Sequence, residues 1–131
     1  MSPRRTLLAL AAAPLLLASC QAGMGPAPQR YVVFFTEDSA ALNENGEQII
    51  RTAAAAARAA PAARITVLGF AGPAGSAAFN QAISDARARH VADTLVQQGI
   101  PAGRIDIRPR GPVPFEAMPT ESRRVEIAIG G

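Results

Sequence analysis

Two helix patterns alternate with short runs of β-branched and aromatic residues along most of this chain of 131 residues. The first helix is predicted from about Glu44 to Ala60, with Asn43 as its N-cap, and the second from about Ala77 to Gln98. Strands are predicted at residues 31–35, 64–69, 104–108 and 124–129. The order β-α-β-α-β-β predicts an α+β fold of two layers, in which both helices cover one face of a sheet.

Apolar residues in the second helix pattern indicate which side of that helix is buried. The predicted buried positions are Phe79, Ile83, Ala86, Val91 and Leu95. Gly99 follows as a C-terminal cap, and segments 71–75 and 111–119 contain enough Gly and Pro to be loops. Phe34 and Phe35 are assigned to the core, because large aromatic side chains of a strand are usually buried.

The first 19 residues have the parts of a secretory signal peptide. Arg4 and Arg5 supply its positive charge, and the apolar stretch 6–18 is shorter than the roughly 20 residues of a membrane-spanning helix. The sequence Leu17-Ala18-Ser19-Cys20 resembles a bacterial lipobox, in which the cysteine is acylated and becomes the new N-terminus. We therefore expect a lipoprotein signal peptide at residues 1–19 and lipid on Cys20, which would attach the protein to the lipid bilayer. The alternatives are an ordinary signal peptide with a chance cysteine and a buried helix.

Composition excludes several kinds of site. The chain has one cysteine and one histidine, too few for a disulfide framework, a cysteine-based zinc cluster or a multi-histidine metal site. Its formal net charge is +3, but two of the arginines lie in the signal peptide, so the mature chain is close to neutral. We therefore expect no nucleic-acid partner, no metal and no cofactor. The single histidine, His90, is expected to be an exposed residue of the second helix.

The segment between the signal peptide and the first strand is expected to be a tether. Residues 20–29 contain two Gly and two Pro, which disfavour both a helix and a paired strand. Residues 30–131 are expected to form one domain, because the chain is too short for a second.

Several segments of this domain share their order and spacing with one known family. They are Gly69–Gly75, Phe79-Asn80, Ile83-Ser84-x-x-Arg87-Ala88-x-x-Val91, Gly99-Ile100 and Ser122–Ile127. Together they resemble the OmpA-like peptidoglycan-binding domain, which the C-terminal domain of OmpA shares with peptidoglycan-associated lipoprotein and MotB. The resemblance extends over residues 31–129 and implies an OmpA C-terminal-domain-like fold, in agreement with the order of elements derived above.

The resemblance implies a groove for the diaminopimelate side chain of the peptidoglycan stem peptide. That side chain ends in an ammonium and a carboxylate on one carbon, so the groove needs two opposite charges close together. Arg87 stands at the family position that holds the carboxylate, and Asn80 stands at the family's asparagine. Arg123 and Arg124 match an arginine pair of the last strand. Neighbouring strand residues point to opposite faces, so one of the two is expected to face the groove.

The part of the groove that would bind the ammonium departs from the family pattern. Where the family has Gly-His-Thr-Asp, this chain has Gly69-Phe70-Ala71-Gly72, so Gly72 replaces the aspartate that holds the ammonium. A desolvated, charge-assisted contact contributes about 1.5–3 kcal/mol. We therefore expect weakened binding unless another carboxylate takes its place. The acids considered for this are Glu37, Asp38 and Asp85.

The lipobox and the resemblance together predict an outer-membrane lipoprotein whose OmpA-like domain faces the periplasm and contacts peptidoglycan. By resemblance to bacterial lipoproteins, Gln21 in place of an aspartate after the cysteine favours the outer membrane. The alternative is a degenerate OmpA-like scaffold that binds another envelope protein, with Phe70 and Ala71 as an apolar pocket wall. An enzyme is not expected, because the sequence has no nucleophile elbow and no paired-acid site.

Overall fold

The computed structural model describes residues 27–113 and 122–130 of the chain. Its elements are β1 (Gln29–Phe34), α1 (Glu44–Ala59), β2 (Ile65–Ala71), α2 (Ala77–Gln97), the short 3-10 helix η1 (Ala102–Arg104), β3 (Ile105–Pro112) and β4 (Arg124–Ile129). The predicted α+β class and the order β-α-β-α-β-β are confirmed. The expected signal peptide, Cys20, residues 21–26 of the expected tether and most of the expected loop 111–119 lie outside the described residues.

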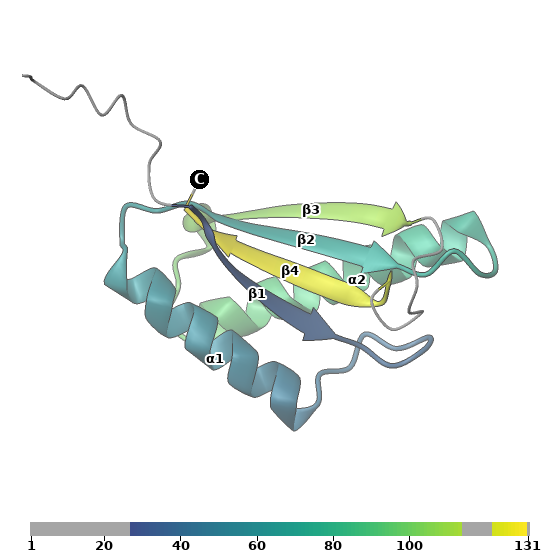
Figure 1. Ribbon diagram of the computed structural model, residues 1–131, viewed down its shortest axis with the longest axis horizontal. Coiled ribbons are helices and arrows are strands. Elements are labelled where there is room, and N and C mark those ends of the chain that lie inside the picture. Colours follow the sequence, from purple (N-terminus) through teal and green to yellow (C-terminus); the bar gives the residue numbers. More distant parts are fainter. Residues whose placement is uncertain (1–26, 114–121, 131) are drawn as a thin grey trace, which may run out of the picture.

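The strands form one sheet in the order β1-β4-β2-β3 (Figure 1). β4 lies between β1 and β2 and is antiparallel to both, whereas β2 and β3 are parallel. A parallel pair needs a long crossover connection, and α2 provides it. Because of these directions, the end of β1, the end of β2 and the beginning of β4 meet at the same edge of the sheet.

Both helices lie on one face of the sheet (Figure 1). α1 packs against β1 and β4, α2 packs against β2 and β3, and the helices contact each other. As predicted, Asn43 caps α1 by accepting a hydrogen bond of 2.8 Å from the backbone N–H of Gly46. Gly99, which follows α2, has a φ of 92°, as a C-terminal cap requires. Neither helix covers the opposite face of the sheet, so the domain has two layers.

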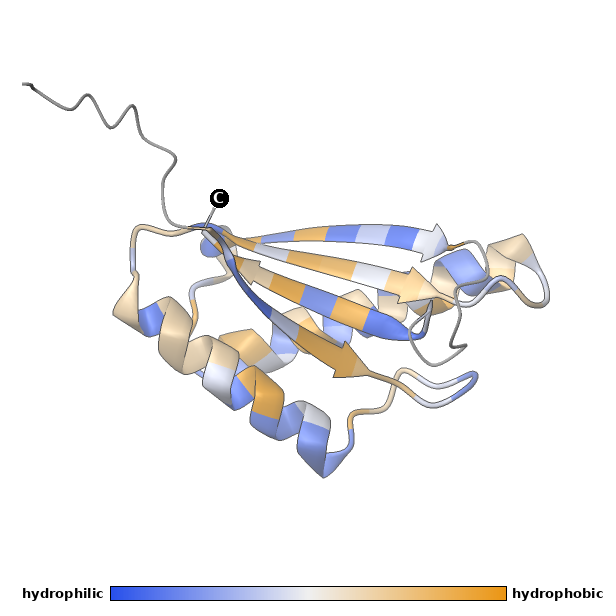
Figure 2. Cartoon of the chain, in the orientation of Figure 1, coloured by the Kyte–Doolittle hydropathy of each residue, from blue (hydrophilic) through white to orange (hydrophobic). Residues whose placement is uncertain are grey.

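Apolar side chains between the sheet and the helices form the core. Along β2 and β4 every second residue is buried, and the alternation along β4 is visible in its colours in Figure 2. The largest apolar side chains in the core include Val33, Ile50, Ile65, Val67, Val91, Leu95, Val125 and Ile127. From α1 the core also receives Ala53, Ala54 and Ala57, whose small side chains permit a close approach of this helix to the sheet.

Several residues assigned to the core lie elsewhere. Phe79 is 49% exposed and Phe34 is 45% exposed, so both predictions are wrong, whereas Phe35 is buried as predicted. On α2, Ala86 is exposed and Ile83 is only half-buried. The buried side of the helix is therefore rotated from the predicted one. It consists of Asn80, Ser84, Arg87, Ala88, Val91, Ala92 and Leu95.

A glycine on β2 explains why a polar residue of α2 faces the sheet. The Ser84 hydroxyl donates a hydrogen bond of 2.7 Å to the carbonyl oxygen of Gly69 and accepts one of 2.9 Å from the backbone N–H of Gly111. A Cβ on Gly69 would overlap the carbonyl oxygen of Ser84. Only glycine permits this close approach of helix and strand, and it leaves no space there for a large side chain such as Phe79.

Three strands extend further than predicted. β1 begins at Gln29, inside the segment expected to be a tether, and β2 and β3 continue into segments expected to be loops. The last residues of β2 and β3 pair with each other, Ala71 with Pro112, after a bulge between Gly69 and Phe70. Strand pairing therefore outweighs the local preference of Gly and Pro for turns at these positions.

Candidate functional site

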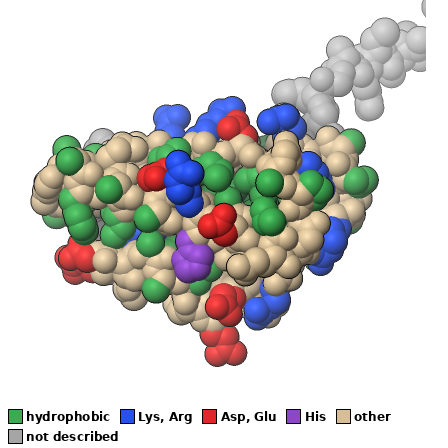
Figure 3. All heavy atoms as spheres, turned by 180° about the vertical axis from the view of Figure 1, so that it is seen from behind, with side chains coloured by type: hydrophobic (Ala, Val, Ile, Leu, Met, Phe, Trp, Pro, Cys, Tyr) green, Lys and Arg blue, Asp and Glu red, His purple; other side chains and the backbone are tan. Residues whose placement is uncertain are grey.

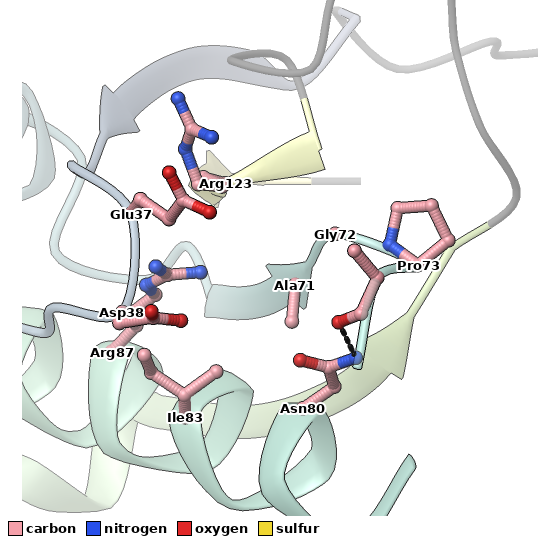
Figure 4. A pocket seen from close by; sticks show the side chains of 10 residues that line it. Glu37, Asp38, Ala71, Gly72, Pro73, Asn80, Ile83, Arg87 and Arg123 are labelled. Carbon is pink, nitrogen blue, oxygen red and sulfur yellow. Dashed lines mark hydrogen bonds between the residues drawn. The ribbon is translucent and has the colours of Figure 1, made fainter. Parts of the chain in front are cut away.

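A cavity of about 220 Å³ lies at the edge of the sheet where β1 and β2 end and β4 begins (Figure 4). Its walls come from the loop after β1, the end of β2 with the turn that follows, the first half of α2 and the residue before β4. They include Glu37, Asp38, Ala71, Gly72, Asn80, Ile83, Arg87 and Arg123. Four of the five residues predicted for ligand binding thus line one cavity, and the fifth, Arg124, does not.

Arg87 is the largest fully buried side chain of the described residues, with 1% of its surface exposed. Its Nε donates to the carbonyl oxygen of Ser39 at 2.8 Å, its Nη1 to that of Phe70 at 3.3 Å and its Nη2 to that of Thr36 at 3.1 Å. A guanidinium has five N–H groups, so these bonds leave one on Nη1 and one on Nη2 without an acceptor among the described residues. Two N–H groups on the two Nη atoms are the donors that a carboxylate binds with both of its oxygens.

The positive charge of Arg87 is held in an unfavourable environment. Burial lowers the pKa of Arg87 from its usual value, the nearby charge of Arg123 lowers it further, and Asp38 opposes the shift. The guanidinium nevertheless stays protonated at neutral pH, as arginine does in proteins. Its charge lies over the ring of Phe35 at 5.3 Å but has no ion pair among the described residues. A ligand with a negative group would supply the missing counter-charge.

Two of the three acids considered from the sequence line the cavity. In Figure 4, Asp38 lies beside Arg87, and Glu37 lies between Asp38 and Arg123. Both acids are exposed, and neither has a hydrogen bond or an ion pair with a described residue. Asp85 does not line the cavity, and its carboxylate is paired at 2.9 Å with an arginine one turn further along α2.

Asn80 is buried at the beginning of α2 and braces the turn after β2. Its Nδ2 donates to the carbonyl oxygen of Ala74 at 2.8 Å, the bond drawn as a dashed line in Figure 4. The Ser76 hydroxyl caps the same helix end by accepting a bond from the backbone N–H of Phe79 at 3.3 Å. Asn80 therefore fixes the turn that forms one wall of the cavity and also faces the cavity itself.

Arg123 and Arg124 lie on opposite sides of the sheet, as expected for neighbours in sequence. Arg123 lines the cavity, and its Nε donates to the carbonyl oxygen of Phe35 at 3.4 Å. Arg124 lies on the uncovered face, where its guanidinium stacks 4.2 Å from the centre of the Phe70 ring and pairs with Glu126 at 2.9 Å. Arg123 is therefore the member of the pair that faces the cavity.

Gly72 lines the cavity at the position where the resemblance places an aspartate. The nearest neighbour of a Cβ built there is the Cβ of Ser122, at 4.0 Å, so a side chain would fit. The hydroxyl of Ser122 is buried and has no partner among the described residues. The expectation that Phe70 forms an apolar wall is wrong, because its ring lies against Arg124 and only Ala71 of the expected pair lines the cavity.

The side chains of α2 hold the loop after β1 through contacts that the sequence did not predict. In addition to the bonds of Arg87, the Nδ1 of His90 lies 2.7 Å from the carbonyl oxygen of Ala40. His90 is exposed, as expected, but it has this structural contact. The only indication in the sequence is the spacing of three residues between Arg87 and His90, which puts them on one side of a helix.

The described residues contain no group of His, Cys, Asp and Glu suited to a metal ion, and none of their helices is long and apolar enough to cross a membrane. On the face shown in Figure 3, arginines and acids are interspersed around the single histidine. Such mixing is typical of a solvated surface, whereas nucleic-acid-binding proteins gather their positive charge in a patch or stripe.

Comparison with known proteins finds relatives of most of the chain. It is 33% identical over 118 residues to an outer membrane protein of Gluconacetobacter diazotrophicus, which covers 79% of this chain and 31% of that protein. It is 33% identical over 103 residues to the peptidoglycan-binding protein ArfA of Mycobacterium tuberculosis, which covers 74% of this chain and 32% of that protein. The chain spans at most about a third of the length of these curated relatives.

The fold has a close counterpart among solved structures. The peptidoglycan-associated lipoprotein of Burkholderia pseudomallei matches with a TM-score of 0.69 and 20% identity, over 76% of this chain and 89% of that one. This likeness shows the OmpA C-terminal-like fold. The sequence model of the OmpA family matches residues 34–124, which span β2, α2 and the residues that line the cavity. The chain therefore belongs to the OmpA family.

Proposed function

We propose that this protein is an outer-membrane lipoprotein whose OmpA-like domain faces the periplasm and binds peptidoglycan weakly through the cavity. Residues 1–19 are the signal peptide, Cys20 carries the lipid, and the residues up to β1 tether the domain. The names of two relatives, an outer membrane protein and a peptidoglycan-binding protein, support an envelope location and a cell-wall ligand. The domain acts by binding and carries out no reaction.

The observation that carries this proposal is the buried guanidinium of Arg87 in an open cavity. Its two remaining N–H groups can bind both oxygens of a carboxylate, and such a ligand would neutralise a buried charge that has no ion pair among the described residues. The diaminopimelate side chain of peptidoglycan ends in a carboxylate next to an ammonium. Arg123, on the same cavity, adds a second positive charge that attracts the carboxylate.

Gly72 makes the binding weaker than it would be with an aspartate at this position. A desolvated contact between an ammonium and a carboxylate contributes about 1.5–3 kcal/mol, which is on the order of a ten- to hundredfold change in affinity. The acids that do line the cavity are exposed, and an exposed ion pair contributes about 0.2–1 kcal/mol. The cavity therefore contains carboxylates that can bind the ammonium, but each contributes little to the affinity.

A second candidate function is a scaffold that binds another envelope protein through the uncovered face of the sheet. Phe34 is 45% exposed on that face, and Arg124, its partner in the β1–β4 register, stacks on Phe70. Aromatic and arginine side chains are enriched in protein interfaces. A scaffold would lose its partner on Phe34→Ser and be indifferent to changes in the cavity, whereas a wall-binding protein would show the opposite sensitivity.

Co-sedimentation of the mature, unlipidated chain with purified sacculi tests wall binding. We expect weak sedimentation with sacculi whose stem peptides contain diaminopimelate, and less with sacculi that contain lysine instead. Gly72→Asp should increase binding about tenfold, because the new carboxylate lies across the cavity from Arg87 and beside the unpartnered hydroxyl of Ser122. Gly72→Asn, which adds the same volume without charge, is the matched control. Equal sedimentation of all three with both kinds of sacculi would contradict the proposal.

Cell fractionation tests the anchor. The native protein should sediment with membranes and partition into detergent, because its N-terminus carries acyl chains. Cys20→Ala should release a periplasmic protein or leave an unprocessed precursor. A native protein that is unmodified and begins at another residue would refute lipidation.

A further inference from the structure

We propose that Asp38 holds the ligand's ammonium in place of the aspartate that Gly72 replaces. The cavity then recognises a carbon that bears both an ammonium and a carboxylate through two neighbouring residues, Asp38 and Arg87. This inference rests on the proposed function and adds the residue that gives the site its specificity for a zwitterionic end group.

The position of Asp38 in the cavity is the first reason for this assignment. The ammonium and the carboxylate of the ligand share one carbon, so an acid that binds the ammonium must lie within reach of the ligand group that Arg87 binds. Asp38 lies beside Arg87 in Figure 4, and its charge is close enough to raise the pKa of Arg87 in part, although burial and the charge of Arg123 lower it by more. Glu37 lies beside Arg123 in the same view.

The backbone around Asp38 is held in place by Arg87 itself. The guanidinium bonds to the carbonyl oxygens of Thr36 and Ser39, which stand on either side of Asp38 in the sequence. His90 binds the next carbonyl, that of Ala40. The side chain that binds the carboxylate therefore also positions the loop that carries the acid, and the two charges form one preorganised unit.

The Asp38 carboxylate is available for a ligand. It has no hydrogen bond and no ion pair with the described residues, although it lies next to a buried arginine. Its backbone has a φ of 51°, in the left-handed region, where asparagine and aspartate are tolerated better than most residues. Asp38→Asn therefore removes the charge with little change in shape or backbone preference. Asp85→Asn makes the same chemical change at a carboxylate that does not line the cavity, and it is the matched control.

Calorimetric titration of the mature, unlipidated chain with two ligands tests the inference. One ligand is meso-diaminopimelate, and the other is pimelate, which has the same carbon chain and both carboxylates but no ammonium. The native protein should prefer meso-diaminopimelate. Asp38→Asn should lower the affinity for meso-diaminopimelate about fivefold and leave the affinity for pimelate unchanged or higher. Asp85→Asn should change the affinity for meso-diaminopimelate less than about twofold.

A rescue variant strengthens the test. Adding Gly72→Asp to Asp38→Asn should restore the preference for meso-diaminopimelate, because the ammonium then has a carboxylate on the other wall. If Asp38→Asn binds meso-diaminopimelate as the native protein does, while the native protein sediments with sacculi, the inference is wrong and the proposed function stands. If the native protein binds neither sacculi nor meso-diaminopimelate, the proposed function itself fails, and the inference fails with it.

Discussion

Arg87, the buried cation of the cavity, belongs to the protein core, whereas the acids of the cavity lie in an exposed loop. Arg87 is buried on α2 and bonded to three backbone carbonyls, two of them in that loop. Glu37 and Asp38 are exposed and have no partner among the described residues. Arg87 is therefore part of the fold as well as of the proposed binding site, whereas the two acids are not needed for the fold.

The largest difference in stability is expected between substitutions on the buried and on the exposed side of α2, the helix that carries Arg87. Val91→Asp should lower the free energy of unfolding by about 4 kcal/mol or more, because it buries an unpaired charge in the core. Val96→Asp, on the exposed side of the same helix, should change it by less than about 0.5 kcal/mol. Urea denaturation followed by circular dichroism measures both. A stable, cooperatively unfolding Val91→Asp variant would show that the helix faces are assigned incorrectly.

Substitutions of Arg87 and of Asp38 should differ in their effect on the free energy of unfolding. Arg87→Ala removes the donors of three carbonyls and leaves a cavity, so it should destabilise the domain by about 3 kcal/mol. Asp38→Asn should change stability by less than about 0.5 kcal/mol, because the carboxylate has no partner among the described residues. The same denaturation experiment compares them. Equal stability of the two variants would mean that the arginine is not part of the core.

Gly69 and Gly72, three residues apart in the chain, should differ in how well they tolerate a side chain, with a smaller effect on stability. Gly69→Ala should cost about 2 kcal/mol, because its Cβ meets the backbone of Ser84 and α2 must move away from β2. Gly72→Ala should be nearly neutral, since its Cβ has space beside Ser122. Thermal unfolding of the pair provides the measurement, and a neutral Gly69→Ala would disprove the close approach of helix and strand.

The fold could be predicted from the sequence because its determinants are local. Alternating strand patterns, the Asn43 cap and the Gly99 terminus define the elements within a few residues. The buried side of α2 could not be predicted in the same way. Apolar periodicity favours Phe79 and Ile83, but the close approach at Gly69 selects Ser84 and Arg87 for the buried side.

The candidate site could be predicted only in part, for a related reason. The resemblance identified Arg87, Asn80, Arg123 and Gly72, all of which line the cavity. It could not tell which acids reach the cavity. That depends on the long-range bonds by which Arg87 and His90 hold the loop after β1, and these bonds are made to backbone carbonyls, which leave no trace in the residue types.

In the proposed function, the free N–H groups of Arg87 bind the ligand's carboxylate. Nuclear magnetic resonance of the mature, unlipidated chain with 15N-labelled arginine observes these groups directly during titration with meso-diaminopimelate. We predict that the Arg87 guanidinium signals shift and saturate with the bound fraction, and that 1,5-diaminopentane, which has ammonium groups and no carboxylate, shifts them less. Saturating binding of meso-diaminopimelate with unshifted Arg87 signals would contradict the claim.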